Sequence, residues 1–210
     1  MPRRRIANPL ALAVLVTLAE RPAHPYEVAT ILRGRAKHDS IKLNYGSLYT
    51  VVNGLLRFGL IEPLETEREG GRPERTVYAI TDPGRIEMVD WLSELISTPV
   101  KEYTQFEAGL SLLPALPPGE AQWLLVERAR RLEAEIGHIR SLHGLAREKG
   151  LPRLFAVEGE YRLALLEADL AFTSELAREI ADGTLGGIDG WRRVHAGRPG
   201  EPWQIPEDIL

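Results

Sequence analysis

The sequence contains no cysteine among its 210 residues. This absence excludes disulfide bonds, cysteine-ligated zinc and thiol catalysis, and it is consistent with a reducing compartment. Long apolar runs are also lacking, because the apolar stretch from Leu10 to Ala19 is too short to span a bilayer. Hydrophobic residues make up 44% of the chain and charged residues 27%, the ordinary composition of a globular protein with a real core.

Motifs of the common enzyme classes are lacking as well. We find no glycine-rich phosphate loop, no nucleophile elbow and no His-Glu-x-x-His pattern. His138 and His143 are five residues apart, so they do not share a helical face as two metal ligands at a spacing of four would. We therefore expect no enzymatic activity, no metal site and no cofactor.

The N-terminus permits two interpretations. Three arginines at positions 3–5 precede the apolar stretch, which is the order found in a signal peptide. However, Asn8 and Pro9 are a good N-cap and first residue for a buried helix over residues 9–20, and we favour that helix. N-terminal sequencing of the cellular protein distinguishes the two. The arginines themselves either add an arm to a nucleic-acid contact or form a loose charged terminus.

Charge is distributed unevenly along the chain. The formal net charge is -4, yet residues 1–57 contain nine lysines and arginines against three acids. Residues 99–210 reverse this balance, with 13 basic against 18 acidic residues. A basic excess confined to the first three predicted helices is the local charge pattern that a DNA-contacting face requires.

The stretch from residue 44 to residue 61 organises the N-terminal half. Asn44 is a good N-cap and Gly59 a good C-terminal stop for a helix between them. Its apolar residues recur every three or four positions, which predicts one buried stripe. This stripe consists of Leu48, Val52, Leu55 and Leu56. The opposite face is polar and nearly free of acids, as suits a surface against phosphates and base edges, although a plain surface helix has the same appearance.

The surrounding elements predict a winged helix. Helices are expected over residues 9–20 and from Pro25, with a minor strand at residues 41–43. After the third helix, residues 60–67 and 75–81 have strand-like patterns and enclose a glycine-rich tip. A fourth helix is expected to begin at a cap formed by Asp82 and Pro83. Three helices followed by a β-hairpin place the third helix in the major groove and the hairpin, or wing, against the flanking backbone.

The expected DNA contacts come from the third helix, from Lys42 two residues before the Asn44 cap, and from the wing. Asn53 is the best candidate for a base contact, because an amide donates to and accepts from adenine at once. Lys42, Arg72 and Arg75 are expected to hold the phosphate backbone, although Glu74 and the acids before the tip weaken the wing's attraction for phosphate. The complete predicted set is Lys42, Tyr45, Ser47, Tyr49, Thr50, Asn53, Arg72 and Arg75.

Several spaced motifs give the chain a family resemblance. They are Gly46-Ser47-Leu48-Tyr49, Leu55, Gly59-Leu60-Ile61, Gly71-Arg72-Pro73, Tyr78-Ala79-Ile80-Thr81 and Gly84. Together they resemble the PadR family of bacterial transcriptional regulators over about residues 9 to 96. The resemblance implies a cytoplasmic, homodimeric regulator of the family's longer class, in which a repressor releases DNA on binding a small aromatic or hydrophobic compound. In the family an aromatic residue near the end of the fourth helix stacks on planar ligands, which implies an effector site at Trp91, with Tyr103 and Phe106, unless Trp91 simply packs in the domain junction.

The C-terminal half reads as helix with an irregular end. A stripe from Leu125 to Ala146 has the spacing of a helix seam, and residues 160–181 carry apolar side chains on more than one face. Because two such helices cannot cover this surface alone, we expect a partner chain. The predicted dimer interface is Leu125, Leu132, Ile136, Ile139, Leu165 and Phe172. The expected fold is mainly α with a small β-hairpin wing, in three parts: residues 1–97 for DNA binding, 98–182 for helical dimerisation and 183–210 as an irregular tail.

Two alternative functions remain open on this evidence. The acidic wing and negative net charge also suit a protein-interaction module built on a winged helix. A non-specific architectural nucleic-acid binder without an effector is the other. A specific regulator should select an inverted repeat from genomic DNA, whereas an architectural protein should enrich fragments without a motif.

Overall fold

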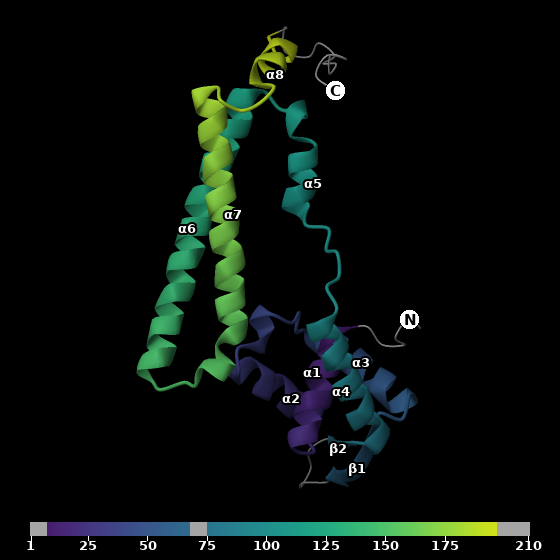
Figure 1. Cartoon of the computed structure of the whole chain (residues 1–210). Coiled ribbons are helices and arrows are strands. Elements are labelled where there is room, and N and C mark those ends of the chain that lie inside the picture. Colours follow the sequence, from purple (N-terminus) through teal and green to yellow (C-terminus); the bar gives the residue numbers. More distant parts are fainter. Residues whose placement is uncertain (1–7, 68–74, 197–210) are drawn as a thin grey trace. The chain divides into compact units, whose positions relative to one another are not determined.

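The computed structural model describes residues 8–67 and 75–196, and of residues 45, 65–67 and 75 only the backbone is considered (Figure 1). The chain divides into two compact units, Met1–Lys101 and Glu102–Leu210, called unit 1 and unit 2 below. The predicted class, mainly α with one small β-hairpin, is confirmed.

Unit 1 contains four helices and a hairpin within the described residues. The helices are α1 (Pro9–Glu20), α2 (Pro25–Gly34), α3 (Tyr45–Arg57) and α4 (Asp82–Ser97), with a short 3-10 turn, η1 (Lys37–Asp39). Strands β1 (Ile61–Glu67) and β2 (Arg75–Ile80) pair antiparallel, with Ile61 opposite Ile80 and an irregularity between Pro63 and Glu65. This order is the winged-helix arrangement that the sequence predicts.

Helix α1 is the centre of the unit 1 core. Its residues Leu10, Val14 and Leu15 are fully buried, and α2, α3, α4 and β2 all pack against it. Asn8 caps the helix by accepting a hydrogen bond from the Leu10 backbone N–H at 3.0 Å. The one buried polar side chain of the helix, Thr17, donates its hydroxyl to the Ala13 carbonyl at 2.8 Å, so its burial leaves no donor unsatisfied.

Two local expectations need correction. Residues 41–43 form no strand, because the chain turns through η1 after Ala36, which adopts a left-handed conformation with φ of 55°. The extra strand contact comes instead from Ala23, which exchanges two backbone hydrogen bonds of 3.1 Å with Tyr78 of β2. The cap of α4 is Thr81 rather than Asp82, since its hydroxyl accepts from the Gly84 N–H at 3.1 Å.

Unit 2 is built on a helical hairpin. The long helices α6 (Pro118–Glu148) and α7 (Val157–Asp182) lie side by side, joined through the 3-10 turn η3 (Arg153–Phe155) (Figure 1). Helix α5 (Gln105–Ser111) and the turn η2 (Leu113–Ala115) precede them, and α8 (Ile188–Val194) follows. The predicted stripe from Leu125 to Ala146 lies on α6, and the predicted helix over residues 160–181 corresponds to α7.

The packing of α6 against α7 changes the predicted dimer interface. The α6 side chains Leu125, Leu132, Ile136 and Ile139 are 3–8% exposed within the single chain. They therefore face α7 of the same chain and leave little surface for a partner. Leu165 and Phe172 on α7 are each 53% exposed, so they stay candidates for a contact with a second copy.

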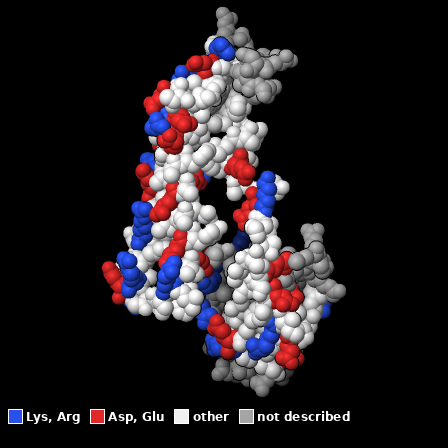
Figure 2. All heavy atoms as spheres, viewed as in Figure 1, with Lys and Arg blue, Asp and Glu red and all other residues white. Residues whose placement is uncertain are grey.

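Ion pairs accompany this hairpin. Arg140 donates to Glu167 at 2.7 Å and Arg162 to Glu135 at 2.5 Å, each pair joining α6 to α7. Arg128 makes a bidentate contact with Asp169, which also accepts a hydrogen bond from the fully buried Thr173. Figure 2 shows basic and acidic side chains intermixed along the visible face of these helices. Most of the pairs are exposed, so each contributes little to stability.

The segment after α7 is not irregular throughout. Gly183 ends α7 in a left-handed conformation with φ of 72°, and residues 188–194 then form α8. Ile188 is buried in a small core with Leu125, Ala177 and Ile180. The indole N–H of Trp191 donates to the Leu116 carbonyl at 2.8 Å. The prediction of an irregular tail is therefore wrong for residues 188–194, and residues 197–210 lie outside the described residues.

Candidate nucleic-acid interface

Helix α3 divides cleanly into a buried and an exposed face. Leu48 and Leu55 are fully buried, and Val51 and Val52 are 6% and 3% exposed. This pattern confirms the buried stripe, with Val51 added to it and Leu56 only half-buried. The helix begins after Asn44, whose side-chain oxygen accepts from the Ser47 backbone N–H at 2.7 Å. Gly59 has a φ of 67°, the left-handed conformation that favours glycine after a helix.

The exposed face of α3 presents neutral polar groups and one cation. Thr50, Asn53 and Arg57 are exposed, Tyr49 is 49% exposed and Ser47 is half-buried. Helix α3 contains no aspartate or glutamate, so nothing on it repels a phosphate. The Thr50 hydroxyl donates to the Gly46 carbonyl at 3.1 Å, which leaves its oxygen free to accept a hydrogen bond.

Asn53 is placed to make new hydrogen bonds. Within residues 8–67 and 75–196, its amide has no hydrogen-bond partner. It lies one helical turn before Arg57, whose guanidinium carbon is 4.9 Å from the centre of the Phe58 ring. An amide and a guanidinium at a spacing of four share one helical face. Arg57 is therefore added to the candidate DNA contacts. Its spacing of four residues from Asn53 is the feature of the sequence that indicates a shared helical face.

The structure describes the side chain of some of the remaining predicted DNA contacts and only the backbone of others. Lys42 is exposed two residues before Asn44. The backbone of Tyr45 begins α3, and the backbone of Arg75 begins β2 opposite Glu67. Arg72 lies outside the described residues. Lys42 thus precedes the N-terminal end of α3, and the exposed α3 side chains lie along one face of that helix.

The three predicted effector residues belong to two different units. Trp91 is 5% exposed and packs in the core of unit 1. Tyr103 precedes α5 and is 85% exposed. Phe106 on α5 packs against the small core of unit 2, with the Arg128 guanidinium carbon 3.5 Å from the centre of its ring. Trp91 belongs to unit 1, whereas Tyr103 and Phe106 belong to unit 2, so a pocket that contains all three residues stays a prediction.

Two further properties bear on other functions. Over the part of the chain that the structure describes, none of the helices combines the length and apolar character needed to cross a bilayer. Within these same ranges, histidine and acidic side chains do not gather in groups of three that could hold a metal ion.

The fold and the exposed α3 define unit 1 as a winged helix-turn-helix domain. A family model confirms and narrows this class, because the transcriptional regulator PadR-like family matches residues 14–90. These residues, from α1 into α4, thus form a domain of the PadR-like family. None of the curated proteins matches the chain.

Solved structures resemble more of the chain than the family model covers. Bacillus subtilis PadR in complex with operator DNA is 19% identical, with a TM-score of 0.62 over 83% of this chain and 99% of that one. The same protein in complex with p-coumaric acid is 16% identical, with a TM-score of 0.65 over 82% and 98%. The Vibrio cholerae virulence activator AphA is 18% identical, with a TM-score of 0.62 over 83% and 99%. At these identities the likeness shows a shared fold.

Proposed function

We propose that this protein is a sequence-specific DNA-binding transcriptional regulator that reads DNA with α3. The observation that supports this most directly is the exposed face of α3. It offers hydroxyls, an amide and one guanidinium without a carboxylate, in a helix that the winged-helix arrangement leaves accessible. The match of residues 14–90 to a family of transcriptional regulators supports the same conclusion.

The proposed DNA-contacting side chains divide into those that contact bases and those that contact the phosphate backbone. Asn53 makes a bidentate contact with an adenine, and Tyr45, Ser47, Tyr49 and Thr50 contact neighbouring base edges or phosphates. Lys42, with Arg72 and Arg75 of the wing, holds the phosphate backbone. The N-terminal end of α3 adds the positive end of its helix dipole and backbone N–H groups that favour a nearby phosphate.

The regulator acts as a homodimer on an inverted-repeat operator, and we propose that it represses. Half-exposed apolar side chains on α7, Leu165 and Phe172 among them, provide surface for a second copy. A twofold dimer places two α3 helices on two half-sites, which is why its operator has the same symmetry. The structure of Bacillus subtilis PadR, a protein of similar fold, in complex with operator DNA supports binding to an operator.

A small aromatic or hydrophobic effector completes the proposal. Bacillus subtilis PadR in complex with p-coumaric acid is the similar structure that motivates it. Trp91, Tyr103 and Phe106 remain the residues proposed to line that site. The test is ligand-induced release from DNA by the Trp91→Ala variant. If this release is the same as in the wild-type protein, Trp91 does not belong to the site.

Selection of genomic fragments tests the central claim. The purified protein should enrich an inverted repeat from the genomic DNA of its source, and deletion of its gene should raise transcription from the adjacent promoter. Enrichment without a motif supports an architectural nucleic-acid binder instead. Enrichment of no fragment supports a protein-interaction module and removes the regulator proposal.

Three variants separate reading from holding. Asn53→Ala should weaken binding to the selected operator by about 1–3 kcal/mol and barely change binding to random DNA, since only the base contact is lost. Lys42→Ala should weaken both and reduce the salt slope by about 0.9, the value of one phosphate contact. Lys149→Ala removes an exposed lysine of unit 2 and serves as the control. If Asn53→Ala still binds the operator in preference to random DNA as strongly as the wild type does, α3 does not recognise the operator sequence through this residue.

A further inference from the structure

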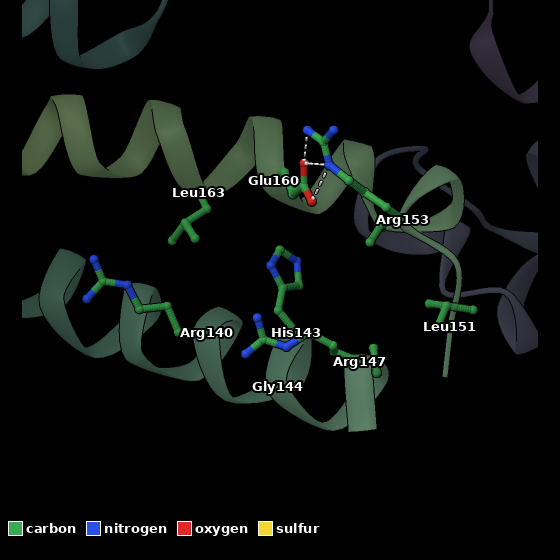
Figure 3. Close-up of a pocket in the computed structure, with 10 residues that line it drawn as sticks. Arg140, His143, Gly144, Arg147, Leu151, Arg153, Glu160 and Leu163 are labelled. Atoms are coloured by element: carbon green, nitrogen blue, oxygen red, sulfur yellow. Dashed lines mark hydrogen bonds and ion pairs between the residues drawn. The ribbon is translucent and has the colours of Figure 1, made fainter. Parts of the chain in front are cut away.

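A cleft opens at the end of the helical hairpin of unit 2, where η3 connects α6 to α7 (Figure 3). Its volume is about 610 Å3, within the range of small-molecule sites. The lining combines cationic and apolar side chains from both helices and their connection. The lining residues are Arg140, His143, Gly144, Ala146, Arg147, Leu151, Arg153, Ala156, Glu160 and Leu163. The proposed effector residues do not belong to it.

The charges of this cleft do not cancel. Arg140 is paired with Glu167 at 2.7 Å, and Arg153 makes three hydrogen bonds of 2.9–3.1 Å to Glu160. Those hydrogen bonds hold the pKa of Glu160 below its ordinary value, so this pair stays ionised and neutral overall. Arg147, by contrast, has no ion-pair partner within the described ranges. The cleft therefore presents one uncompensated guanidinium.

Two glycines shape the space beside this guanidinium. A Cβ at Gly159 of α7 would lie 2.3 Å from the His143 ring, so the glycine lets the imidazole rest directly against the α7 backbone. A Cβ at Gly144 of α6 would meet nothing within 4 Å, because the open space of the cleft begins there. Figure 3 shows His143 reaching from α6 toward α7, with Leu163 beside it on the α7 side.

We propose that this cleft binds a small organic anion, with its carboxylate on Arg147 and its apolar body against the apolar side chains of the lining. A guanidinium binds a carboxylate through two parallel hydrogen bonds, which fixes the head of the ligand. The apolar lining removes the remainder of the ligand from water, as in most small-molecule sites. An anion is favoured over a cation or a neutral ligand because the other two arginines already have acidic partners. None of the proposed DNA-contacting residues belongs to the lining of this cleft.

Substitutions at glycine provide the sharpest test, with benzoate as the probe and binding followed by NMR titration. The wild-type protein should bind benzoate with a dissociation constant of about 10 mM or below, the affinity expected of a ligand of this size. Gly144→Leu should abolish binding, because a Cβ at this position meets nothing within 4 Å and the larger side chain takes up space in the cleft beside Arg147. Gly137→Leu is the matched control: it lies on the same helix, also meets nothing within 4 Å and does not line the cleft. It should leave the affinity unchanged.

The role of charge is tested separately. Arg147→Gln should weaken benzoate binding at least about fivefold, whereas Arg131→Gln, an exposed α6 arginine outside the cleft, should not. Benzamide, the neutral analogue, should bind more weakly than benzoate and be insensitive to Arg147→Gln. Three results overturn the proposal: no benzoate binding, equal effects of the test and control variants, or equal affinity for benzamide. If the wild-type protein does not bind benzoate and Arg147→Gln changes the oligomeric mass, the cleft serves self-association, and the proposal of an anion site is likewise wrong.

Discussion

Gly84→Ala should destabilise unit 1, although alanine is the better helix former. Gly84 lies in the first turn of α4, where a Cβ would come within 2.0 Å of the Leu60 carbonyl oxygen and 2.8 Å of the Ile80 side chain. Ordinary van der Waals contact begins at 3.4 Å. The start of α4 therefore has to move away from the backbone that connects α3 to β1 by more than an ångström.

The magnitude follows from the contacts that this movement breaks. The Thr81 backbone N–H donates to the Leu60 carbonyl at 3.1 Å, and the Thr81 hydroxyl donates to the Gly59 carbonyl at 2.7 Å. Each hydrogen bond is worth about 1 kcal/mol, and overpacking adds about 1–3 kcal/mol. Part of the strain is relieved when the hydrogen bonds break, so we expect a net loss of about 2–4 kcal/mol.

Hydrogen exchange with mass spectrometry measures this loss in unit 1 alone. Peptides from the core of α1 should exchange roughly 30-fold faster or more in Gly84→Ala, because each 1.4 kcal/mol is a factor of ten. Peptides from α6 and α7 should not change. Gly137→Ala, where a Cβ meets open space, is the control and should be stabilising by up to about 1 kcal/mol. Unchanged or slower α1 exchange in Gly84→Ala refutes the reasoning.

Two further predictions concern an ion pair and the oligomeric state. The Arg35 guanidinium donates to both carboxylate oxygens of Glu20, at 2.6 and 2.7 Å, and holds the pKa of Glu20 below its ordinary value of 4.5. This ion pair therefore stabilises the fold fully above pH 4.5, and the contribution is lost as the pH falls from there through the lowered pKa of Glu20. Glu20→Gln should cost about 0.5 kcal/mol in urea unfolding at pH 7 and nothing in strong acid, and an equal deficit at both pH values contradicts this. Light scattering should give twice the chain mass of 23.5 kDa for the wild-type protein and for Phe172→Leu. Phe172→Asp should give the mass of one chain, because a charged side chain at this half-exposed position opposes the contact. If both variants have the same mass, the result argues against an interface on α7.

The local structure of this protein was largely predictable from sequence because its signals act over a few residues. The Asn8-Pro9 start of α1, the Asn44 cap of α3 and the left-handed Gly59 after it all lie where the residue types predict. The alternation of helical and strand-like patterns likewise predicted the hairpin and its place after α3. The failures at residues 41–43 and at the α4 cap are short segments where neighbouring signals compete, such as Thr81 beside Asp82 and Pro83.

The candidate DNA-contacting face was predictable for the same reason. A helix with one apolar stripe must bury that stripe, so its opposite side is exposed wherever the helix docks. Hence Thr50, Asn53 and Arg57 could be placed on the exposed side before the fold was known. What the sequence alone did not decide was which element covers the apolar side, because any apolar surface of suitable shape satisfies it.

That choice of partner is what the tertiary structure decided. The α6 stripe packs on α7 of the same chain, and Trp191 of α8 reaches the Leu116 carbonyl 75 residues away. The same holds for the close approach at Gly84 and for the cleft beside Gly144, since each depends on backbone from a distant segment. Sequence patterns specify which side chains need to leave water and where helices begin and end. Hydrophobic burial is non-directional, so only the folded chain determines which surfaces meet and which spaces stay open.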